Sequence, residues 1–353
     1  MAQSTMFLTK MTVSHQESGR VPRRLPLGMM FPARANAPLF GKPAGIPMSP
    51  PQLPSTANVY LYGMIVLSTV HRLAADFPEA DGYGEIDETH VIPGGETGNS
   101  ALVLSRWGHR VKVAGPYLGQ QTREGILGFL AQRGIDCSAL TYDPSFDGVR
   151  DLVIVGGKSR AVFGRFGQYF RGPRRWAKPE RADIAAADIV GIDPFFDAES
   201  AEVGGLCVEL GRPYVTIDCE PESALHRGSA ATVVSAEYLR GRYPSRERRE
   251  LLRLYAAQSA GLVIITCGSE EILFGRGGGE IHSVKPFKIV PKSTLGAGDT
   301  FRGGVVHGVF NGLSDEGIVR FAAATAACVC RRFPMAFDPP GLSEIAALME
   351  SGG

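Results

Sequence analysis

The chain has 353 residues, and its 37 Lys or Arg against 36 Asp or Glu give a formal net charge of +1. This balance provides no electrostatic footprint for nucleic acid across the molecule, and 44% apolar residues exclude wholesale disorder. Six scattered cysteines, with no CxxC pair and no histidine at zinc-finger spacing, argue against a zinc site and a disulfide framework. No apolar run approaches the ~20 residues that a spanning helix needs. We therefore expect a cytoplasmic protein that binds neither nucleic acid nor membrane.

The first 57 residues differ in composition from the rest of the chain. They carry six basic residues, one acidic residue and nine of the 24 prolines, without the periodicity that would bury one face of an element. We predict that residues 1–57 form a disordered basic tail and that residues 58–353 form the folded domain. A targeting segment, or an over-long start upstream of Met29 or Met48, is the alternative for the tail.

Short β-rich runs alternate with helix-like stretches along the body. The run at 59–67 is continuously apolar and predicts one buried strand. Further strand-like runs lie at 111–114, 152–155, 189–192, 214–217, 232–234 and 262–266, and helix-like stretches lie at 98–107, 122–132, 198–210 and 245–259. Such alternation indicates a parallel sheet covered on both faces.

Three segments do not follow this alternation. Residues 68–93 and about 143–172 lack helical periodicity and carry turn residues, so we predict a small antiparallel sheet over one edge. The glycine-rich stretch at 275–279 lies between two strand-like runs and no helix follows it. A hairpin turn is therefore the favoured interpretation there, rather than a phosphate loop.

The stretch Ser293–Gly304 carries the clearest chemical signal. Gly296-Ala297-Gly298 precedes an apolar pattern typical of a helix, and backbone N–H groups at a helix start bind anions. Asp299, in the same turn, would sit beside a bound phosphate and could accept the proton of an attacking hydroxyl. The alternative is that Asp299 only caps the helix. Local chemistry alone does not separate these two interpretations.

Two motifs resemble the signatures of one known family. The sequence Thr-Leu-Gly-Ala-Gly-Asp-Thr-Phe at 294–301 resembles the C-terminal signature of the ribokinase-like (PfkB) carbohydrate kinases. The sequence Gly-Gly-Glu-Thr-Gly-Asn-Ser-Ala at 94–101 matches that family's Gly-Gly-x-x-x-Asn-x-Ala, and the family order of residues continues to about residue 136. The resemblance covers about 58–345. It implies an α/β fold, a three-layer sandwich with a mostly parallel central sheet and a small β-sheet lid.

The resemblance also implies roles for individual residues. Asp299 would be the general base, and the anion hole would be formed by Gly296, Ala297 and Gly298. The sugar hydroxyls would contact Gly94, Gly95 and Asn99. The nucleotide would contact Thr266, Gly268 and Ser235. The expected cofactors are ATP and Mg²⁺, with Glu237 near the metal and the phosphates.

Several positions depart from the family pattern. Ser68 stands where the family commonly has an Asp that contacts sugar hydroxyls, so we include Ser68 among the substrate-binding candidates. With one acid fewer, the pocket is expected to tolerate a sugar acid. Ser293 replaces the Asp that usually opens the second signature, which weakens a monovalent-cation site. Glu271 replaces the last glycine of the nucleotide loop, and the Asn of Asn-x-x-Glu is missing.

The function that these residues favour is ATP-dependent phosphorylation of a hydroxyl on a sugar or sugar acid. One alternative is a nucleoside kinase of the same fold, for which aromatic residues of the lid could stack on a base: Phe163, Phe166, Tyr169 and Phe170. Another is a ligand-binding regulator without turnover. The sequence leaves the sugar and the phosphorylated hydroxyl unidentified, and it leaves open a homodimer formed through the lid.

Overall fold

The computed structural model describes residues 56–157 and 159–352. The predicted tail, residues 1–57, therefore lies outside the described residues except for its last two. Ala57 is buried, and its backbone N–H donates to His109 Nδ1 at 3.1 Å. The folded domain thus includes Ala57.

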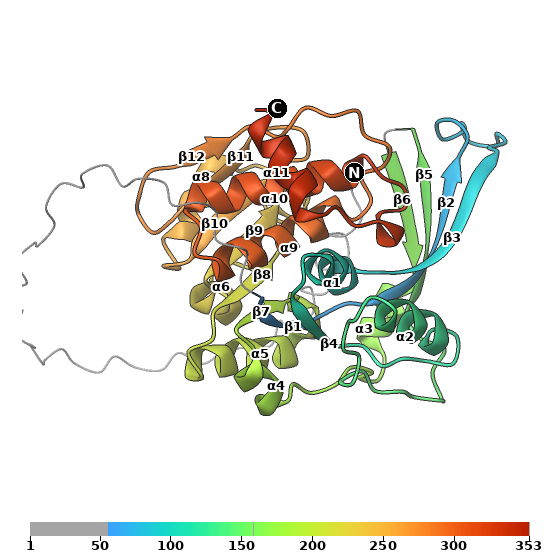
Figure 1. The fold of residues 1–353 in the computed structure, drawn as a ribbon, viewed down its shortest axis with the longest axis horizontal. Helices are drawn as coiled ribbons and strands as arrows, with labels where there is room; N and C mark the ends of the chain where they lie inside the picture. The colour runs from blue at the N-terminus through green and yellow to red at the C-terminus, as the bar shows by residue number, and fades with distance from the viewer. Residues whose placement is uncertain (1–55, 158, 353) are drawn as a thin grey trace, which may run out of the picture.

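The central sheet has the strand order β12-β11-β10-β9-β8-β7-β1-β4 (Figure 1). From β4 to β10 the strands pair in parallel, whereas β11 and β12 are added antiparallel at one edge. Their bounds are β1 Asn58–Tyr62, β4 Arg110–Ala114, β7 Ile189–Ile192, β8 Tyr214–Ile217, β9 Ala231–Ser235, β10 Leu262–Thr266, β11 Ile272–Gly275 and β12 His282–Val284. The predicted α/β architecture is confirmed, and the glycine-rich stretch at 275–279 connects the antiparallel β11 and β12.

Helices cover both faces of this sheet. Successive residues of a strand point to opposite sides, so each strand places apolar side chains against both helical layers. Val59 and Leu61 of β1 belong to one buried cluster, whereas Tyr60 and Tyr62 belong to another. The first face carries α1 Glu96–Arg106, α2 Arg123–Ala131, α9 Ala297–Phe310, α10 Asp315–Cys330 and α11 Leu342–Glu350. The second face carries α4 Arg181–Ala186, α5 Asp197–Glu209, α6 Ala224–Gly228, α7 Ala236–Arg242 and α8 Arg248–Ala256. The result is a three-layer sandwich.

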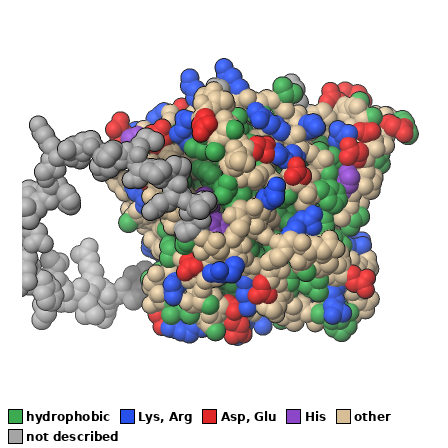
Figure 2. All heavy atoms as spheres, in the orientation of Figure 1, with side chains coloured by type: hydrophobic (Ala, Val, Ile, Leu, Met, Phe, Trp, Pro, Cys, Tyr) green, Lys and Arg blue, Asp and Glu red, His purple; other side chains and the backbone are tan. Residues whose placement is uncertain are grey.

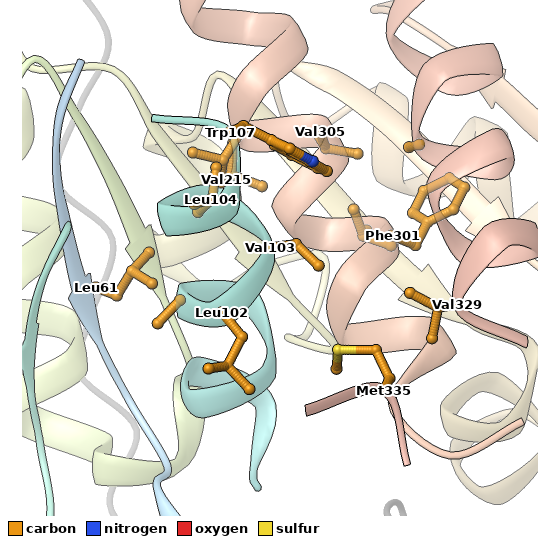
Figure 3. Close-up of a cluster of buried hydrophobic side chains, with 14 of the residues drawn as sticks. Leu61, Leu102, Val103, Leu104, Trp107, Val215, Phe301, Val305, Val329 and Met335 are labelled. Carbon is orange, nitrogen blue, oxygen red and sulfur yellow. The ribbon is translucent and has the colours of Figure 1, made fainter. Parts of the chain in front are cut away.

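The packing of α1 against α9 positions the site described below. Figure 3 shows apolar side chains of both helices meeting in one cluster, among them Leu102, Val103, Phe301 and Val305. Each is at most 3% exposed, and burying one such side chain is worth ~1.5–3 kcal/mol. The N-terminal turns of α1 and α9 are therefore held side by side.

A second sheet, here called the lid, stands at one end of the sandwich (right side of Figure 1). It has the order β3-β2-β5-β6, with β2 Val66–Leu73, β3 Ile86–Gly94, β5 Arg150–Gly156 and β6 Ser159–Gly164. The predicted segments thus form a small sheet, but it is not wholly antiparallel. Two antiparallel hairpins are joined by a parallel pairing of β2 with β5. Part of the second segment forms the helix α3 Phe166–Arg171.

The prediction of one continuous strand at 59–67 is wrong. The chain leaves the central sheet after Tyr62 and enters the lid at Val66. Gly63 lies at this exit, where a Cβ atom would stand only 2.0 Å from Asp193 Oδ2. The apolar run hides the bend because both of its halves are buried, one in each sheet.

The surface carries charges of both signs. Figure 2 shows Lys and Arg side chains interspersed with Asp and Glu side chains over the visible face. Among the residues that the structure describes, no helix has the length and apolar character needed to cross a membrane.

Candidate active site

A pocket of about 250 Å³ lies between the lid and the carboxyl ends of the central strands. In parallel α/β sheets this edge is where ligands bind. Most of the predicted site residues line the pocket: Ser68, Gly94, Gly95, Asn99, Ser235, Glu237, Thr266, Gly296, Gly298 and Asp299. Ala297 and Gly268 are not among its lining residues. Ala297 is the first residue of α9, and Gly268 follows β10 with a φ of 58°.

Asp299 lies in the first turn of α9, beside the pocket. Gly296, the residue before the helix, adopts a left-handed conformation with φ 76°. Asn99 Nδ2 of α1 donates to Asp299 Oδ2 at 2.8 Å, and Ser100 Oγ donates to the Asp299 carbonyl at 2.7 Å. Burial raises the pKa of Asp299, while the Asn99 hydrogen bond and the Arg160 charge oppose that rise. The carboxylate is thus oriented and more basic than an exposed Asp.

A second helix start borders the same pocket. Gly95, which precedes α1, has φ 82°, and a Cβ there would stand 2.6 Å from the Met64 carbonyl oxygen. A side chain at this position would therefore be both strained and obstructed. The close approach brings the N-terminus of α1 to the pocket, beside that of α9. Two helix starts with their partial positive charge thus face one cavity.

A buried ion pair between Arg302 and Asp193 lies behind the site, and neither side chain is exposed. Arg302 Nε also donates to Ser100 Oγ at 3.1 Å. Asp193 Oδ2 accepts from Met64 N–H at 2.7 Å and from Thr97 Oγ at 3.0 Å. The pair therefore ties α9, α1 and the chain ends of β1 and β7 together. The sequence interpretation missed it, and the only available signal was an arginine within the apolar pattern of α9.

Two further acids in the pocket were also missed. Burial, reinforced by the charge of Asp299, raises the pKa of Glu96 to about 8, so Glu96 is mostly protonated at neutral pH. Burial raises the pKa of Asp218 to about 6. Asp218 accepts hydrogen bonds from the backbone N–H of Ser235 at 2.7 Å and from its hydroxyl at 3.1 Å. Asp218 lies outside both motifs, and Glu96 occupies a variable position of the first one.

The nucleotide candidates lie on the side of the pocket formed by β9, α7 and β10. Thr266 ends β10, and Ser235 caps α7 by accepting from the Tyr238 N–H at 3.0 Å. Glu237 lies in the first turn of α7. Within residues 56–157 and 159–352, no three His, Cys, Asp or Glu side chains gather as a metal-binding group. Asp218 and Glu237 still fit Mg²⁺ by donor chemistry, because Mg²⁺ takes one or two carboxylates with waters and phosphate oxygens.

The lid contributes an inner wall that is mainly apolar. Val66, Val70, Val153 and Val162 line the pocket, together with the polar residues Ser68, Asp151 and Arg160. Of the aromatic residues proposed to stack on a base, Phe166 and Phe170 line the pocket, and so does Phe195. Phe163 instead lies on the outside of the lid and is 54% exposed. Tyr169 packs against Trp176, with ring centroids 5.7 Å apart.

Sequence comparison finds a match in the C-terminal third of the chain. Residues 239–339 match the family described as pfkB family carbohydrate kinase. A ribokinase of Lactococcus lactis is 29% identical over 108 residues, which make up 31% of this chain and 34% of that protein. The alignment thus spans about a third of the length of that curated relative.

Structural comparison covers the whole domain. A candidate ribokinase from Agrobacterium tumefaciens superposes with a TM-score of 0.74 at 22% identity, over 84% of this chain and 99% of that one. Arabidopsis thaliana ribokinase complexed with ribose and ATP gives 0.67 at 16% identity, with coverages of 84% and 99%. A nucleoside kinase from Methanocaldococcus jannaschii gives 0.64 at 16% identity, with coverages of 83% and 98%. The chain thus matches the pfkB family over residues 239–339 and has the ribokinase-like fold over its described domain.

Proposed function

We propose that the chain is an ATP-dependent phosphotransferase that phosphorylates a hydroxyl of a sugar or sugar acid. The observation that carries this proposal is the position of Asp299, a carboxylate held by Asn99 in the first turn of α9 and open to the pocket. ATP, bound with Mg²⁺, supplies the transferred phosphoryl group. The acceptor oxygen bonds to the γ-phosphorus, the bond from that phosphorus to ADP breaks, and the hydroxyl proton goes to Asp299.

The other residues hold charge and position the reactants. Gly296 and Gly298 let the backbone at the start of α9 approach the phosphoryl group, and the N–H groups of this first turn lack helical acceptors. Glu237 and Asp218 would hold Mg²⁺, with Thr266 and Ser235 beside the nucleotide. Gly94, Gly95 and Asn99 would contact the acceptor. Ala297 and Gly268 act in this proposal through the backbone geometry of their turns.

The test is an ADP-release screen of the purified protein against neutral sugars, sugar acids and nucleosides. We expect turnover with at least one polyhydroxylated acceptor and a rate lower by ~10²–10⁴ with the Asp299→Asn variant. A nucleoside kinase is the second candidate, because Phe166, Phe170 and Phe195 offer aromatic surface to the pocket. Turnover confined to nucleosides would select that candidate. Ligand binding without any ADP release would select the regulator.

A homodimer through the lid is the assembly that we propose. The cross-strand register places Val91, Thr69, Leu152 and Phe163 in one row across the outer face of the lid. Val91 and Phe163 are 57% and 54% exposed, and exposed apolar surface of this kind marks interfaces. Light scattering coupled to size exclusion should report a dimer for the native protein and a monomer for Phe163→Glu.

A further inference from the structure

The carboxylate of Asp151 lies on the inner face of the lid, and one of its oxygens has no hydrogen-bond partner within the described part of the chain. Asp151 lies in β5 and lines the pocket. Its Oδ1 atom is buried and has no hydrogen-bond partner among the described residues. Burial raises the pKa of Asp151 to about 6, opposed by a hydrogen bond from the Ser68 hydroxyl. A buried acceptor without a partner is costly unless a ligand supplies the missing donor.

The register of the lid explains why Asp151 and Ser68 meet. β2 and β5 pair in parallel, with Ser68 directly opposite Asp151. The neighbouring inward pair is Val70 opposite Val153, and β6 adds Val162 opposite Val153. The acid is thus set into a wall of valines. It is one of three polar residues on this mainly apolar wall, with Ser68 and Arg160, and a few placed polar groups are how small-molecule sites fix the orientation of a ligand.

Asp151 lies on the acceptor side of the pocket. Ser68, its neighbour, also approaches the sugar-loop candidate Gly94, where a Cβ atom would stand 2.8 Å from Ser68 Oγ. The other polar residue of the inner wall, Arg160, reaches away to Thr294, whose Oγ accepts from its guanidinium at 3.1 Å. Thr294 belongs to the turn before α9. The lid therefore presents an acid to the acceptor and a cation to the phosphoryl-transfer side.

The acid also bears on the expectation drawn from Ser68. The lack of an Asp at position 68 suggested one anionic acceptor fewer and a pocket tolerant of sugar acids. The structure places the carboxylate of Asp151, on the adjacent strand β5, directly opposite Ser68. In total the pocket is lined by five acids and one Arg: Asp151, Glu96, Asp218, Glu237, Asp299 and Arg160. Glu96 is mostly protonated, and Asp218 and Glu237 would hold Mg²⁺. The charge of Asp151 itself is therefore what disfavours an anionic group beside it.

We propose that Asp151 is a substrate-binding residue whose carboxylate accepts a hydrogen bond from a hydroxyl of a neutral polyhydroxylated acceptor and selects against sugar acids. This inference rests on the proposed function and narrows its acceptor class. Hydrogen bonds to charged groups are worth ~1.5–3 kcal/mol, which corresponds to roughly 10- to 100-fold in affinity. Asp151 does not touch the reacting oxygen in this assignment, so we expect its loss to weaken acceptor binding and to leave the chemical step nearly unchanged.

The experiment compares Asp151→Asn with the native protein on a panel of neutral sugars and the matching sugar acids. Asp151→Asn keeps the shape of the side chain and removes its charge. We expect the KM for the best neutral sugar to rise about 10-fold or more with kcat within a few-fold. The ratio of kcat/KM for the sugar acid to that for the neutral sugar should rise as well. An unchanged KM in Asp151→Asn, or a native protein that prefers the acid, would overturn the inference.

Moving the acid from β5 to β2 provides the matched control. Asp151→Ser should show the same rise in KM, and the double variant Ser68→Asp with Asp151→Ser should recover most of the affinity by moving the acid across the β2–β5 pair. A swap without recovery would contradict a role for the acid itself. Melting temperatures of all three variants identify any that fail to fold. If a serine-containing variant fails to fold, the KM of Asp151→Asn alone tests the inference.

Calorimetric binding of the same sugars without ATP separates this inference from the proposed function. Binding of a neutral sugar that weakens in Asp151→Asn, with no ADP release, supports the inference and contradicts kinase activity. Failure of the native protein to bind any neutral sugar of the panel overturns the inference, even where another acceptor is phosphorylated.

Discussion

The sandwich and the lid place polar groups in the same pocket by different means. In the sandwich, the charged side chains near Asp299 are tied to protein partners: Asp299 to Asn99, and Arg302 to Asp193. In the lid, Asp151 keeps an acceptor atom that no described residue of the chain contacts by a hydrogen bond. We propose that this difference reflects a division of roles, in which the sandwich would carry the phosphoryl transfer and the lid would select the acceptor. Four predictions test this division, from the largest expected effect to the smallest.

Asp299→Asn should have the largest effect on turnover. An amide keeps the size of the side chain and caps a helix about as well as Asp, but it cannot take the proton. We expect kcat to fall by ~10²–10⁴, the usual worth of a positioned general base, with ATP affinity and melting temperature nearly unchanged. Steady-state kinetics with calorimetric ATP binding check this. Retained turnover would leave Asp299 only as a helix cap.

Arg302→Met should have the largest effect on stability. It leaves Asp193 charged and buried without its partner, and breaking such a pair costs ~3–5 kcal/mol of unfolding free energy. The matched lid variant is Arg72→Met, because Arg72 pairs with Asp87 and Glu88 while its side chain is 32% exposed. That variant should lose about 1 kcal/mol or less. Urea unfolding of both variants measures the two losses of unfolding free energy. Equal losses would contradict the predicted difference between the buried and the exposed ion pair.

The sandwich should also lose stability as the pH falls. His307 is buried, and burial together with the adjacent His109 ring lowers its pKa from 6.5 to about 4. The neutral ring is favoured in the folded state, so its contribution is complete above pH 6.5 and is lost as the pH falls toward 4. Between pH 7.5 and 5 we expect a loss of about 2 kcal/mol from this residue.

Urea unfolding at both pH values measures that loss, and His307→Gln should flatten the profile. The control is His71→Gln in lid strand β2, which should retain the pH dependence of the native protein. If His307→Gln leaves the dependence of unfolding free energy on pH unchanged, other groups produce that dependence.

Arg160→Gln should have the smallest effect of the four. Arg160 joins lid strand β6 to the turn before α9 through Thr294, so the variant weakens the contact of the lid with that turn. We expect KM for the acceptor to rise a few-fold, because a hydrogen bond of this kind contributes ~1 kcal/mol. Arg165→Gln, at an exposed position, is the control. Identical KM values for the acceptor in both variants would show that Arg160 has no role in acceptor binding.

The candidate base and the fold class follow from local sequence. Gly296-Ala297-Gly298-Asp299 predicts a helix start that binds an anion because that property depends on consecutive backbone groups. The alternation of apolar runs with helix-like stretches predicts the parallel sheet because burial repeats along each element with its own period. The bend at Gly63 was not predictable in this way, since an apolar run shows burial but not which sheet buries it.

The tertiary structure decided which distant residues share the pocket. Arg302 pairs with Asp193 from 109 positions away, and Asp151 meets Ser68 only because β2 and β5 happen to be adjacent in the lid. Neither pair has a spacing signature, because the contacts run across strands and between helices rather than along them. By itself the sequence determined the candidate catalytic turn and the layered fold. Only the through-space packing of the lid decided that Asp151 lines the pocket.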